Sequence, residues 1–303
     1  MILKHREKSK LHLGLLALDK RMELQDTDRN YLLNLEKGFE GEELFDTYVK
    51  KYLNKEVIVL NDLLLTSRSS TFQVDSILIM SDTLYIYEIK NYKGNYQMNA
   101  GQLTTLTGQE INSPLNQVSR AKTLMKQLIK DLGYGLSVEA LVIFVHPTFH
   151  LYQAKSSDSF VYPNQIEKHF NAINHRLTSL SKEQRYLAQK LVKENRESVP
   201  YQKQLPDFEY KKLKKAVYCK TCGENQVTVT RKKSYCLLCQ NKQALDKTIL
   251  EHIEEFKLLF PKEKLTARCL YDWCGEQISP RRLRNVCRKH YEKVGTTSNS
   301  YYE

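Results

Sequence analysis

Apolar side chains in the first fifty residues recur at the spacing of a helix. In the segment GFEGEELFDTYVKKYL they stand three and four positions apart, at Phe39, Leu44, Phe45, Tyr48, Val49 and Tyr52. The pattern then changes to short runs rich in β-branched and aromatic residues, at 57–65, 72–80 and 83–92. These runs predict three strands that follow an N-terminal helical region.

A second helical pattern follows the strands. In SPLNQVSRAKTLMKQLIKDLGY, Ser113 is a candidate N-cap, Pro114 lies in the first turn, and an apolar stripe comprises Leu115, Val118, Ala121, Met125, Leu128 and Leu132. The run at 139–147 predicts another strand, and residues 164–195 predict mostly helix. Strands with helices on both faces indicate an α/β domain that we expect to span residues 1–195.

Three charged residues lie inside the two central strands. If these strands form a hairpin that turns at Ser81 and Asp82, residues whose numbers sum to 163 face each other. Asp75 is then opposite Glu88, and Gln73 is opposite Lys90. Strict alternation places Asp75, Glu88 and Lys90 on one face with Ile77, Ile79, Leu84 and Ile86, and leaves the other face to Val74, Leu78, Tyr85, Tyr87 and Ile89.

Opposed carboxylates at this place call for a compensating charge. Two carboxylates directly opposite each other repel by about 0.2–1 kcal/mol at an exposed site, and by more as burial lowers the local dielectric. A divalent cation such as Mg²⁺ offsets the repulsion, and Lys90 is placed to stabilise negative charge on a phosphate. The alternative is a solvated sheet face on which Lys90 pairs with Asp75 or Glu88.

The overall charge favours a polyanionic partner. The chain of 303 residues contains 47 Lys and Arg against 35 Asp and Glu, a net charge of +12. No apolar run is long enough to cross a bilayer, and LHLGLLAL near the N-terminus lacks the small-residue cleavage site of a signal peptide. We therefore expect a cytoplasmic protein that binds nucleic acid and not a membrane.

All seven cysteines lie in the last third of the chain. Cys219, Cys222, Cys236 and Cys239 form two CxxC pairs separated by thirteen residues, a spacing that brings four thiolates around a structural Zn²⁺. This predicts a zinc ribbon at 216–243; a redox role for the CxxC pairs is the alternative. The surrounding cations favour phosphate binding: Lys211, Lys212, Lys214, Lys215, Lys220, Arg231, Lys232 and Lys233.

Two further segments flank the predicted ribbon. Residues 196–215, which are polar and contain two prolines, predict a linker. Residues 244–303 predict a helical region in which one helix, a turn at Gly275 and an Arg-rich second helix that starts at Ser279 and Pro280 are typical of a helix-turn-helix. An alternative for this region is a second zinc site formed by Cys269, Cys274, Cys287 and His290.

Four motifs, in order between residues 35 and 150, resemble those of the NERD (nuclease-related) domain. GFEGE at 38–42 is similar to the family's GxxGE, QVD at 73–75 to its second motif, and EIKNYKG at 88–94 to its ExKNYxG. NSPLNQ at 112–117 is similar to NPxxQ, with Ser113 inserted. Ser76 stands where many relatives have His.

The resemblance implies a fold, a reaction and a set of site residues. NERD domains are grouped with the PD-(D/E)xK nucleases, which implies a restriction-endonuclease-like central mixed sheet flanked by helices. Carried onto this chain, it assigns Asp75 and Glu88 as ligands of Mg²⁺ or Mn²⁺, Lys90 as the catalytic lysine, Glu42 as a helix carboxylate that completes the site and Gln117 as a polar positioner. The residues alone favour the alternative that Glu42 is a first-turn carboxylate stabilised by the helix dipole, and for Gln117 the alternative is a solvated helix residue.

Together these observations predict a metal-dependent nuclease, with DNA as the favoured substrate. With one site per chain, cutting both strands of a duplex requires either a homodimer or sequential nicks. The alternative function is a non-catalytic nucleic-acid-binding or regulatory protein that retains the nuclease fold.

Overall fold

The computed structural model describes residues 1–303 except 54–56, 100, 177–178, 197–203 and 297–299. The chain divides into two compact units, each described here by itself. The sheet unit comprises Met1–Glu7 and Asn34–Gln202, and the cysteine unit comprises Lys8–Leu33 and Lys203–Glu303. The sequence placed all of residues 1–195 in one domain; the structure instead groups residues 8–33 with the C-terminal part of the chain.

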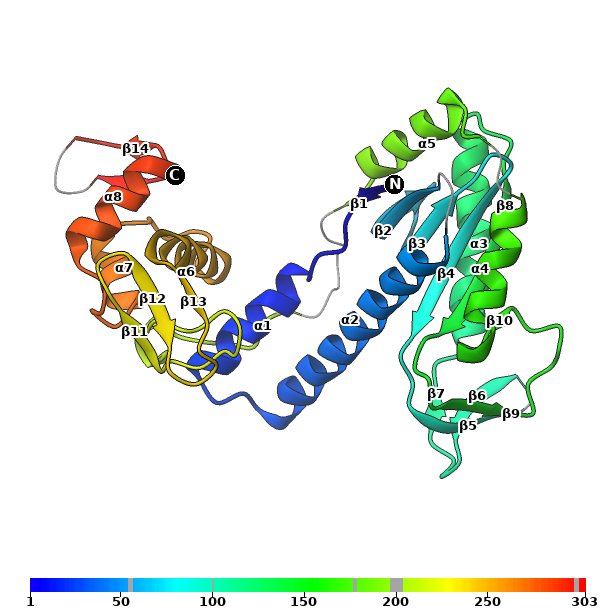
Figure 1. The fold of residues 1–303 in the computed structure, drawn as a ribbon, viewed down its shortest axis with the longest axis horizontal. Coiled ribbons are helices and arrows are strands. Elements are labelled where there is room, and N and C mark those ends of the chain that lie inside the picture. Colours follow the sequence, from blue (N-terminus) through cyan, green and yellow to red (C-terminus); the bar gives the residue numbers. More distant parts are fainter. Residues whose placement is uncertain (54–56, 100, 177–178, 197–203, 297–299) are drawn as a thin grey trace. The chain divides into compact units, whose positions relative to one another are not determined.

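The sheet unit is built on a six-stranded mixed sheet (Figure 1). Its strand order is β1-β2-β3-β4-β8-β10, where β2–β3 and β3–β4 are antiparallel and the other neighbouring pairs are parallel. The strands are β1 (Ile2–Lys4), β2 (Ile58–Ser67), β3 (Ser70–Ile79), β4 (Thr83–Lys90), β8 (Ser137–Phe144) and β10 (Phe160–Val161). The three predicted strands and the strand at 139–147 are confirmed within a few residues, whereas β1 lies in the region predicted to be helical.

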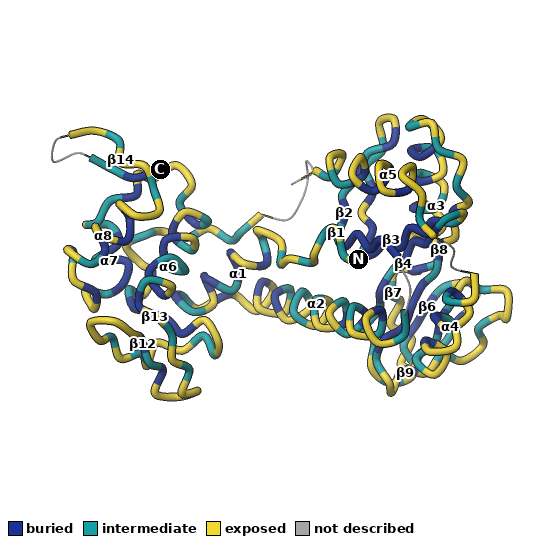
Figure 2. The backbone as a smooth tube through the Cα atoms, turned by 45° about the horizontal axis from the view of Figure 1, so that its top comes forward, coloured by how far each residue is buried: buried dark blue, intermediate teal, exposed yellow. Residues whose placement is uncertain are grey.

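Helices cover both faces of this sheet, so its strands are among the most buried segments (Figure 2). On one face α3 (Pro114–Asp131) and α5 (Lys182–Lys193) pack against a cluster that includes Ile77 and Ile86. On the other face α2 (Asp26–Tyr52) and α4 (Ile166–Arg176) pack against a cluster that includes Leu78 and Tyr87. The expected α/β class with a central mixed sheet is confirmed.

The register of the central hairpin agrees with the prediction over its paired part. Ser76 faces Tyr87 and Ile79 faces Leu84, so the residue numbers sum to 163 as expected. The β3–β4 ladder ends at Ser76, and Gln73 pairs with β2 instead of lying opposite Lys90.

The prediction for Val74 was wrong. Val74 belongs to the same core cluster as Ile77, because the alternation of side chains is interrupted between these residues. The neighbouring strand is interrupted at the matching place, where Asp62 has a φ of 51° and Leu60 and Leu63 both belong to that cluster. The sheet therefore changes the direction of its side chains next to Asp75.

A second, four-stranded sheet lies beyond the end of β4 and was not predicted. Its order is β7-β6-β5-β9, formed by β5 (Gly94–Asn99), β6 (Gln102–Thr105), β7 (Glu110–Ile111) and β9 (Phe149–Tyr152). The four strands of this sheet are short and mixed in polarity, so the sequence has only a weak period-two signal in them. Outside this sheet, a 3-10 turn, η1 (Pro163–Gln165), precedes α4.

The cysteine unit combines a small antiparallel sheet with helices. The sheet order is β11-β12-β13, with β11 (Val227–Val229), β12 (Lys233–Cys236) and β13 (Lys242–Ala244). The other elements are α1 (Lys10–Arg21), η2 (Tyr210–Lys212), α6 (Leu245–Leu259), α7 (Ala267–Trp273), α8 (Pro280–His290), β14 (Lys293–Val294) and β15 (Tyr301–Tyr302). The helix, the turn at Gly275 and the second helix of the predicted helix-turn-helix are present as α7 and α8, although the Ser279 side chain makes no capping bond.

Arg21, at the end of α1, contacts several segments of this unit. Its side chain is fully buried, forms an ion pair with Glu255 at 2.6 Å and lies 3.6 Å from the centre of the Trp273 ring. Arg21 also donates to the carbonyl oxygen of Lys214 at 2.9 Å. Of the predicted linker 196–215, residues 197–203 lie outside the described part, and residues around Lys214 are packed into the unit.

No helix in the described part of the chain is long and apolar enough to cross a membrane.

Candidate active site and metal centre

Asp75, Glu88 and Lys90 lie where β3 and β4 separate. The ladder between these strands stops one pair before Asp75, while β4 continues to pair with β8 as far as Lys90. The Asp75 carboxylate accepts a hydrogen bond at 2.8 Å from the backbone N–H of Ile89. A side chain thus takes the place of a ladder bond, which fixes the carboxylate at the point where the strands part.

Glu88 and Lys90 form an ion pair on the same face of β4. The Lys90 ammonium lies 2.7 Å from Glu88 Oε1, and the side chains are only 18% and 13% exposed. This is the pairing that the alternative interpretation of the sequence proposed. Burial disfavours the Lys90 ammonium, but the charges of Glu88 and Asp75 outweigh it and raise the pKa of Lys90. Lys90 therefore holds its proton more tightly than an exposed lysine does.

Glu42, on α2, reaches the same place through Arg6, a residue that the sequence analysis missed. Arg6 follows β1, and its guanidinium lies 2.6 Å from Glu42 and 3.3 Å from Asp46 while its side chain is 3% exposed. Arg6 Nη1 also donates to the backbone carbonyl of Asp75 at 3.1 Å. Arg6 therefore joins α2 to β3. The charged run LKHREKSK around it carries no periodic or motif signal that would have identified it.

Two motif residues explain how α2 approaches the strand. A side chain at Gly41 would meet the Asn91 Cβ at 2.4 Å, so only glycine fits between α2 and the residues that follow β4. Asn91 in turn donates a hydrogen bond to the Lys37 carbonyl at 2.8 Å. Gly41 and Asn91 belong to different motifs in the sequence, and their contact places Glu42 near the strand ends.

Negative charge is in excess at this site. Burial raises the pKa of Asp75 well above its usual value, and the charges of Glu88 and Glu42 raise it further, against Lys90 and the Ile89 hydrogen bond. Burial likewise raises the pKa of Glu42, although Arg6 opposes the shift. Arg6 and Lys90 thus do not fully compensate the surrounding carboxylates.

The remaining predicted residues lie around this group in different ways. Ser76, buried at the position of the family's His, donates to Asn61 at 2.8 Å, and Asn61 donates to Asp46 at 3.2 Å. Ser76 is therefore connected to the Asp46 carboxylate through Asn61. Gln117 is exposed in the first turn of α3, and in the described part of the chain no hydrogen bond connects it to Asp75, Glu88 or Lys90.

The carboxylates fit a hard cation by their chemistry. Two partly buried carboxylates on neighbouring strands are ligands that Mg²⁺ and Mn²⁺ accept. Glu42, Asp75 and Glu88 do not form a group of three ligands as close as the four cysteines, whose atoms lie within 4.8 Å of one another in the described part of the chain. Each carboxylate has a protein partner instead: Ile89 N–H for Asp75, Lys90 for Glu88 and Arg6 for Glu42.

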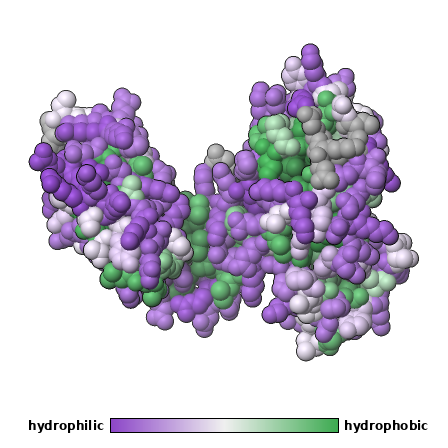
Figure 3. Space-filling model, viewed as in Figure 1, coloured by the Kyte–Doolittle hydropathy of each residue, from purple (hydrophilic) through white to green (hydrophobic). Residues whose placement is uncertain are grey.

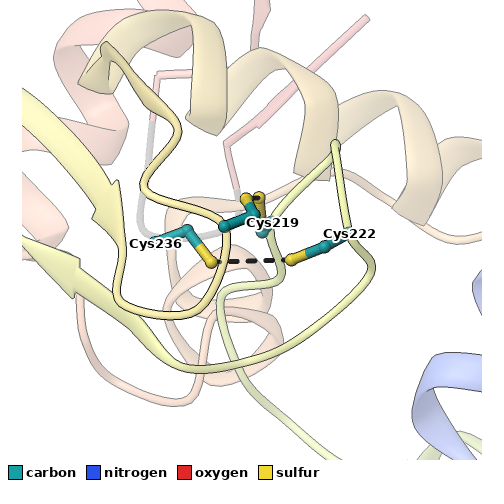
Figure 4. A group of neighbouring side chains, drawn as sticks. Cys219, Cys222 and Cys236 are labelled. Carbon is teal, nitrogen blue, oxygen red and sulfur yellow. Dashed lines mark hydrogen bonds between the residues drawn. The ribbon is translucent and has the colours of Figure 1, made fainter.

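The four ribbon cysteines converge as predicted. All four sulfur atoms lie within 4.8 Å of one another, and the Cys219–Cys239 and Cys222–Cys236 Sγ atoms are 3.6 Å and 3.5 Å apart. Figure 4 shows the Cys222 and Cys236 thiols turned toward one another from two separate loops. Four thiols in this arrangement are compatible with a tetrahedral zinc site.

The two loops that present these cysteines have the same local structure. Gly223 N–H bonds to the Cys219 carbonyl at 2.9 Å, and Gln240 N–H bonds to the Cys236 carbonyl at 3.0 Å. Gly223 and Gln240 both have positive φ, at 78° and 61°. Each CxxC therefore closes one turn that aims both thiols inward. The alternative second site at Cys269, Cys274, Cys287 and His290 is not assembled in the described part of the chain, where these residues form no group of close ligand atoms.

Residues 37–145 match the family model of the nuclease-related domain (NERD). The match includes Glu42, Asp75, Glu88, Lys90 and Gln117, and it supports the resemblance seen in the motifs. No curated protein and no solved structure matches the chain. The sheet unit thus contains a region similar to a nuclease-related domain, and the four clustered cysteines lie outside that region.

Proposed function

We propose that this protein is a metal-dependent nuclease that hydrolyses phosphodiester bonds of nucleic acid, with DNA as the favoured substrate. The observation that carries the proposal is the partly buried group Asp75, Glu88 and Lys90 at the separation of two strands, inside the part of the chain that matches the nuclease-related domain. The PD-(D/E)xK type of site is part of the proposal.

In the proposed reaction, a water oxygen bonds to phosphorus while the bond from phosphorus to the leaving sugar oxygen breaks. Asp75 and Glu88 would hold Mg²⁺ or Mn²⁺, which when bound polarises a phosphate oxygen and acidifies a water. Lys90, held as an ammonium by its raised pKa, stabilises the negative charge that builds on the phosphate oxygens. The water gives up one proton, and the leaving oxygen takes up one.

Glu42 and Arg6 are positioning residues in this scheme. Arg6 connects Glu42 on α2 to the backbone of Asp75, so it holds one ligand strand against the helix. Gln117 would act only if substrate bridges the exposed first turn of α3 to the strand ends. A structural Zn²⁺ at the four cysteines would build the ribbon, and the cytoplasm is a compartment in which these thiols stay reduced.

The test uses the zinc-loaded full chain with supercoiled, linear and single-stranded DNA and with RNA, each with and without Mg²⁺ or Mn²⁺. Lys90→Ala should lower the cleavage rate by 100-fold or more, because a buried charge donor is lost, while binding stays within about two-fold. Lys93→Ala, an exposed lysine in the same motif, is the matched control and should cleave as the wild type does. Equal loss in both variants, or no cleavage of any substrate, would contradict the proposal.

One observation favours the alternative of a non-catalytic nucleic-acid-binding protein. Each carboxylate of the site already has a protein partner, so a cation bound there would share Glu88 with Lys90. Calorimetric titration of Mn²⁺ separates the two functions. The nuclease requires binding that Glu88→Gln abolishes, whereas the alternative expects none in either protein.

A further inference from the structure

A basic groove lies in the cysteine unit, between the ribbon and α8. Its volume is about 620 Å³, and its walls are the tip of the β11–β12 hairpin and the first turn of α8. Four cationic side chains line it: Arg231 and Lys232 from the hairpin, and Arg281 and Arg282 from the helix. Over α8 the surface is strongly hydrophilic on the face that Figure 3 shows.

Both walls are anchored to the start of α6. The Leu245 N–H donates to the Lys232 carbonyl at 2.9 Å, and the next residue, Asp246, forms an ion pair with Arg282 at 2.5 Å. The hairpin tip is itself closed by Thr230, whose hydroxyl and backbone N–H both donate to the Lys233 carbonyl at 2.8 Å. The groove is thus set by hydrogen bonds and an ion pair before any ligand arrives, which lowers the entropic cost of binding.

Its positive charge lacks internal compensation. Apart from the Arg282 pair, no ion pair in the described part of the chain involves Arg231, Lys232 or Arg281. The first turn of α8 contains no acidic residue, and the Ser279 hydroxyl makes no capping bond. The positive end of the helix dipole therefore adds to the cations on one wall.

The lining identifies the part of a ligand that would fit. None of the described side chains that line the groove is aromatic or acidic, so it offers no stacking platform for bases. Small-molecule pockets of this size are mostly apolar, whereas most residues that line this one are cationic or polar. Arginine guanidinium groups bind phosphate oxygens through two parallel hydrogen bonds.

We infer that this groove binds the phosphate backbone of a nucleic acid, independently of base sequence, and so holds the substrate by a surface separate from the Asp75, Glu88 and Lys90 group. The inference rests on the proposed function for the identity of the polyanion. It differs from the predicted helix-turn-helix, because here α8 contacts phosphates with its first turn and the ribbon tip supplies the opposite wall.

The test measures binding of a fluorescently labelled 20-base-pair DNA by anisotropy over a salt series, without added Mg²⁺. The double variant Arg231→Gln, Arg281→Gln should bind at least 10-fold more weakly than wild type. The slope of log K against log salt should become shallower by about 2, because two phosphate contacts are lost. The matched control Lys262→Gln, Arg268→Gln removes the same charge from exposed positions outside the groove and should bind within about two-fold of wild type.

Three results would overturn the inference. The first is groove and control variants that bind equally. The second is a groove variant that has lost its zinc or its circular dichroism spectrum while Lys232→Gln, with an intact fold, binds as wild type does. The third is competition by poly-glutamate that matches unlabelled DNA of equal charge, since the surface would then accept any polyanion.

The inference and the proposed function fail in different ways. If the wild type binds through the groove but never cleaves, and Lys90→Ala binds equally, the nuclease proposal is wrong and the groove remains. If cleavage depends on Lys90 while the groove variant binds as the control does, the groove inference is wrong and the nuclease remains.

Discussion

The carboxylate group of the sheet unit and the cysteine group of the cysteine unit are both sets of candidate metal ligands, yet only the cysteines have converged. The four Sγ atoms lie within 4.8 Å of one another, and they contact each other in two pairs. By contrast, Asp75 is held by a backbone N–H, Glu88 by Lys90 and Glu42 by Arg6.

The difference follows from charge and from how each set is presented. The four sulfur atoms contact one another in two close pairs, and two turns of the same local structure aim them inward. Carboxylates repel, so without a cation they are stable in a buried place only if protein donors satisfy them. The cysteine group is therefore assembled from its own atoms, whereas the carboxylates are partly compensated by Lys90 and Arg6.

The largest expected effect is loss of the ribbon. Cys236→Ser removes one of the four thiolates, and apparent zinc-binding free energy on the order of 10 kcal/mol supports such small folds. We expect zinc content to fall from one equivalent to none and the ribbon amides to exchange rapidly with solvent, while α3 and the central sheet stay protected. Cys269→Ser, a half-buried cysteine outside the cluster, should keep its zinc. Full zinc in the Cys236 variant would show that the comparison is wrong.

A smaller effect is expected from removing the cation beside the carboxylates. Arg6→Ala leaves Glu42 and Asp46 without their buried partner, which should lower the free energy of unfolding by about 3 kcal/mol. Urea unfolding of the zinc-loaded protein, followed by far-UV circular dichroism, measures this change in the free energy of unfolding. Lys122→Ala, which breaks the exposed pair with Glu139, should cost less than about 1 kcal/mol. An equal loss of stability in both variants would mean that the buried Arg6 ion pairs stabilise the fold no more than the exposed pair does.

The smallest expected effect is a gain in the free energy of unfolding, produced by Asp75→Asn. Folding raises the Asp75 pKa, so the folded chain holds that proton more tightly, and metal-free stability falls as pH rises from about 4 through the raised pKa. Asp75→Asn keeps an oxygen that accepts the Ile89 N–H bond and removes the charge. It should stabilise the metal-free protein at pH 7 by about 1 kcal/mol and flatten this pH dependence.

Urea denaturation at pH 4, 5.5 and 7 checks the Asp75 prediction, with Asp75→Ala as the companion that also loses the acceptor. Destabilisation of both variants at pH 7 by a similar amount would assign Asp75 a purely structural role in the sheet.

Much of the fold was predictable because its signals are local. The apolar stripe of α3 predicted that helix to within a few residues. The turn after Met80 predicted the β3–β4 register, in which paired residue numbers sum to 163. The break in alternation beside Val74 was not predictable, because it depends on a matching irregularity at Asp62 in the neighbouring strand. Likewise, β1 and the placement of residues 8–33 depend on partners far away in the sequence.

What the sequence by itself determined is the chemistry available at each site: four cysteines in two CxxC turns, and two carboxylates with a lysine on two neighbouring strands. Short-range turn geometry is enough to aim the thiols, so their convergence followed from spacing alone. The tertiary structure decided which charges surround the carboxylates, since Arg6 and Glu42 reach Asp75 only after β1 and α2 dock on the sheet. It also decided the basic groove, because hairpin tip and helix meet only through their separate bonds to Leu245 and Asp246.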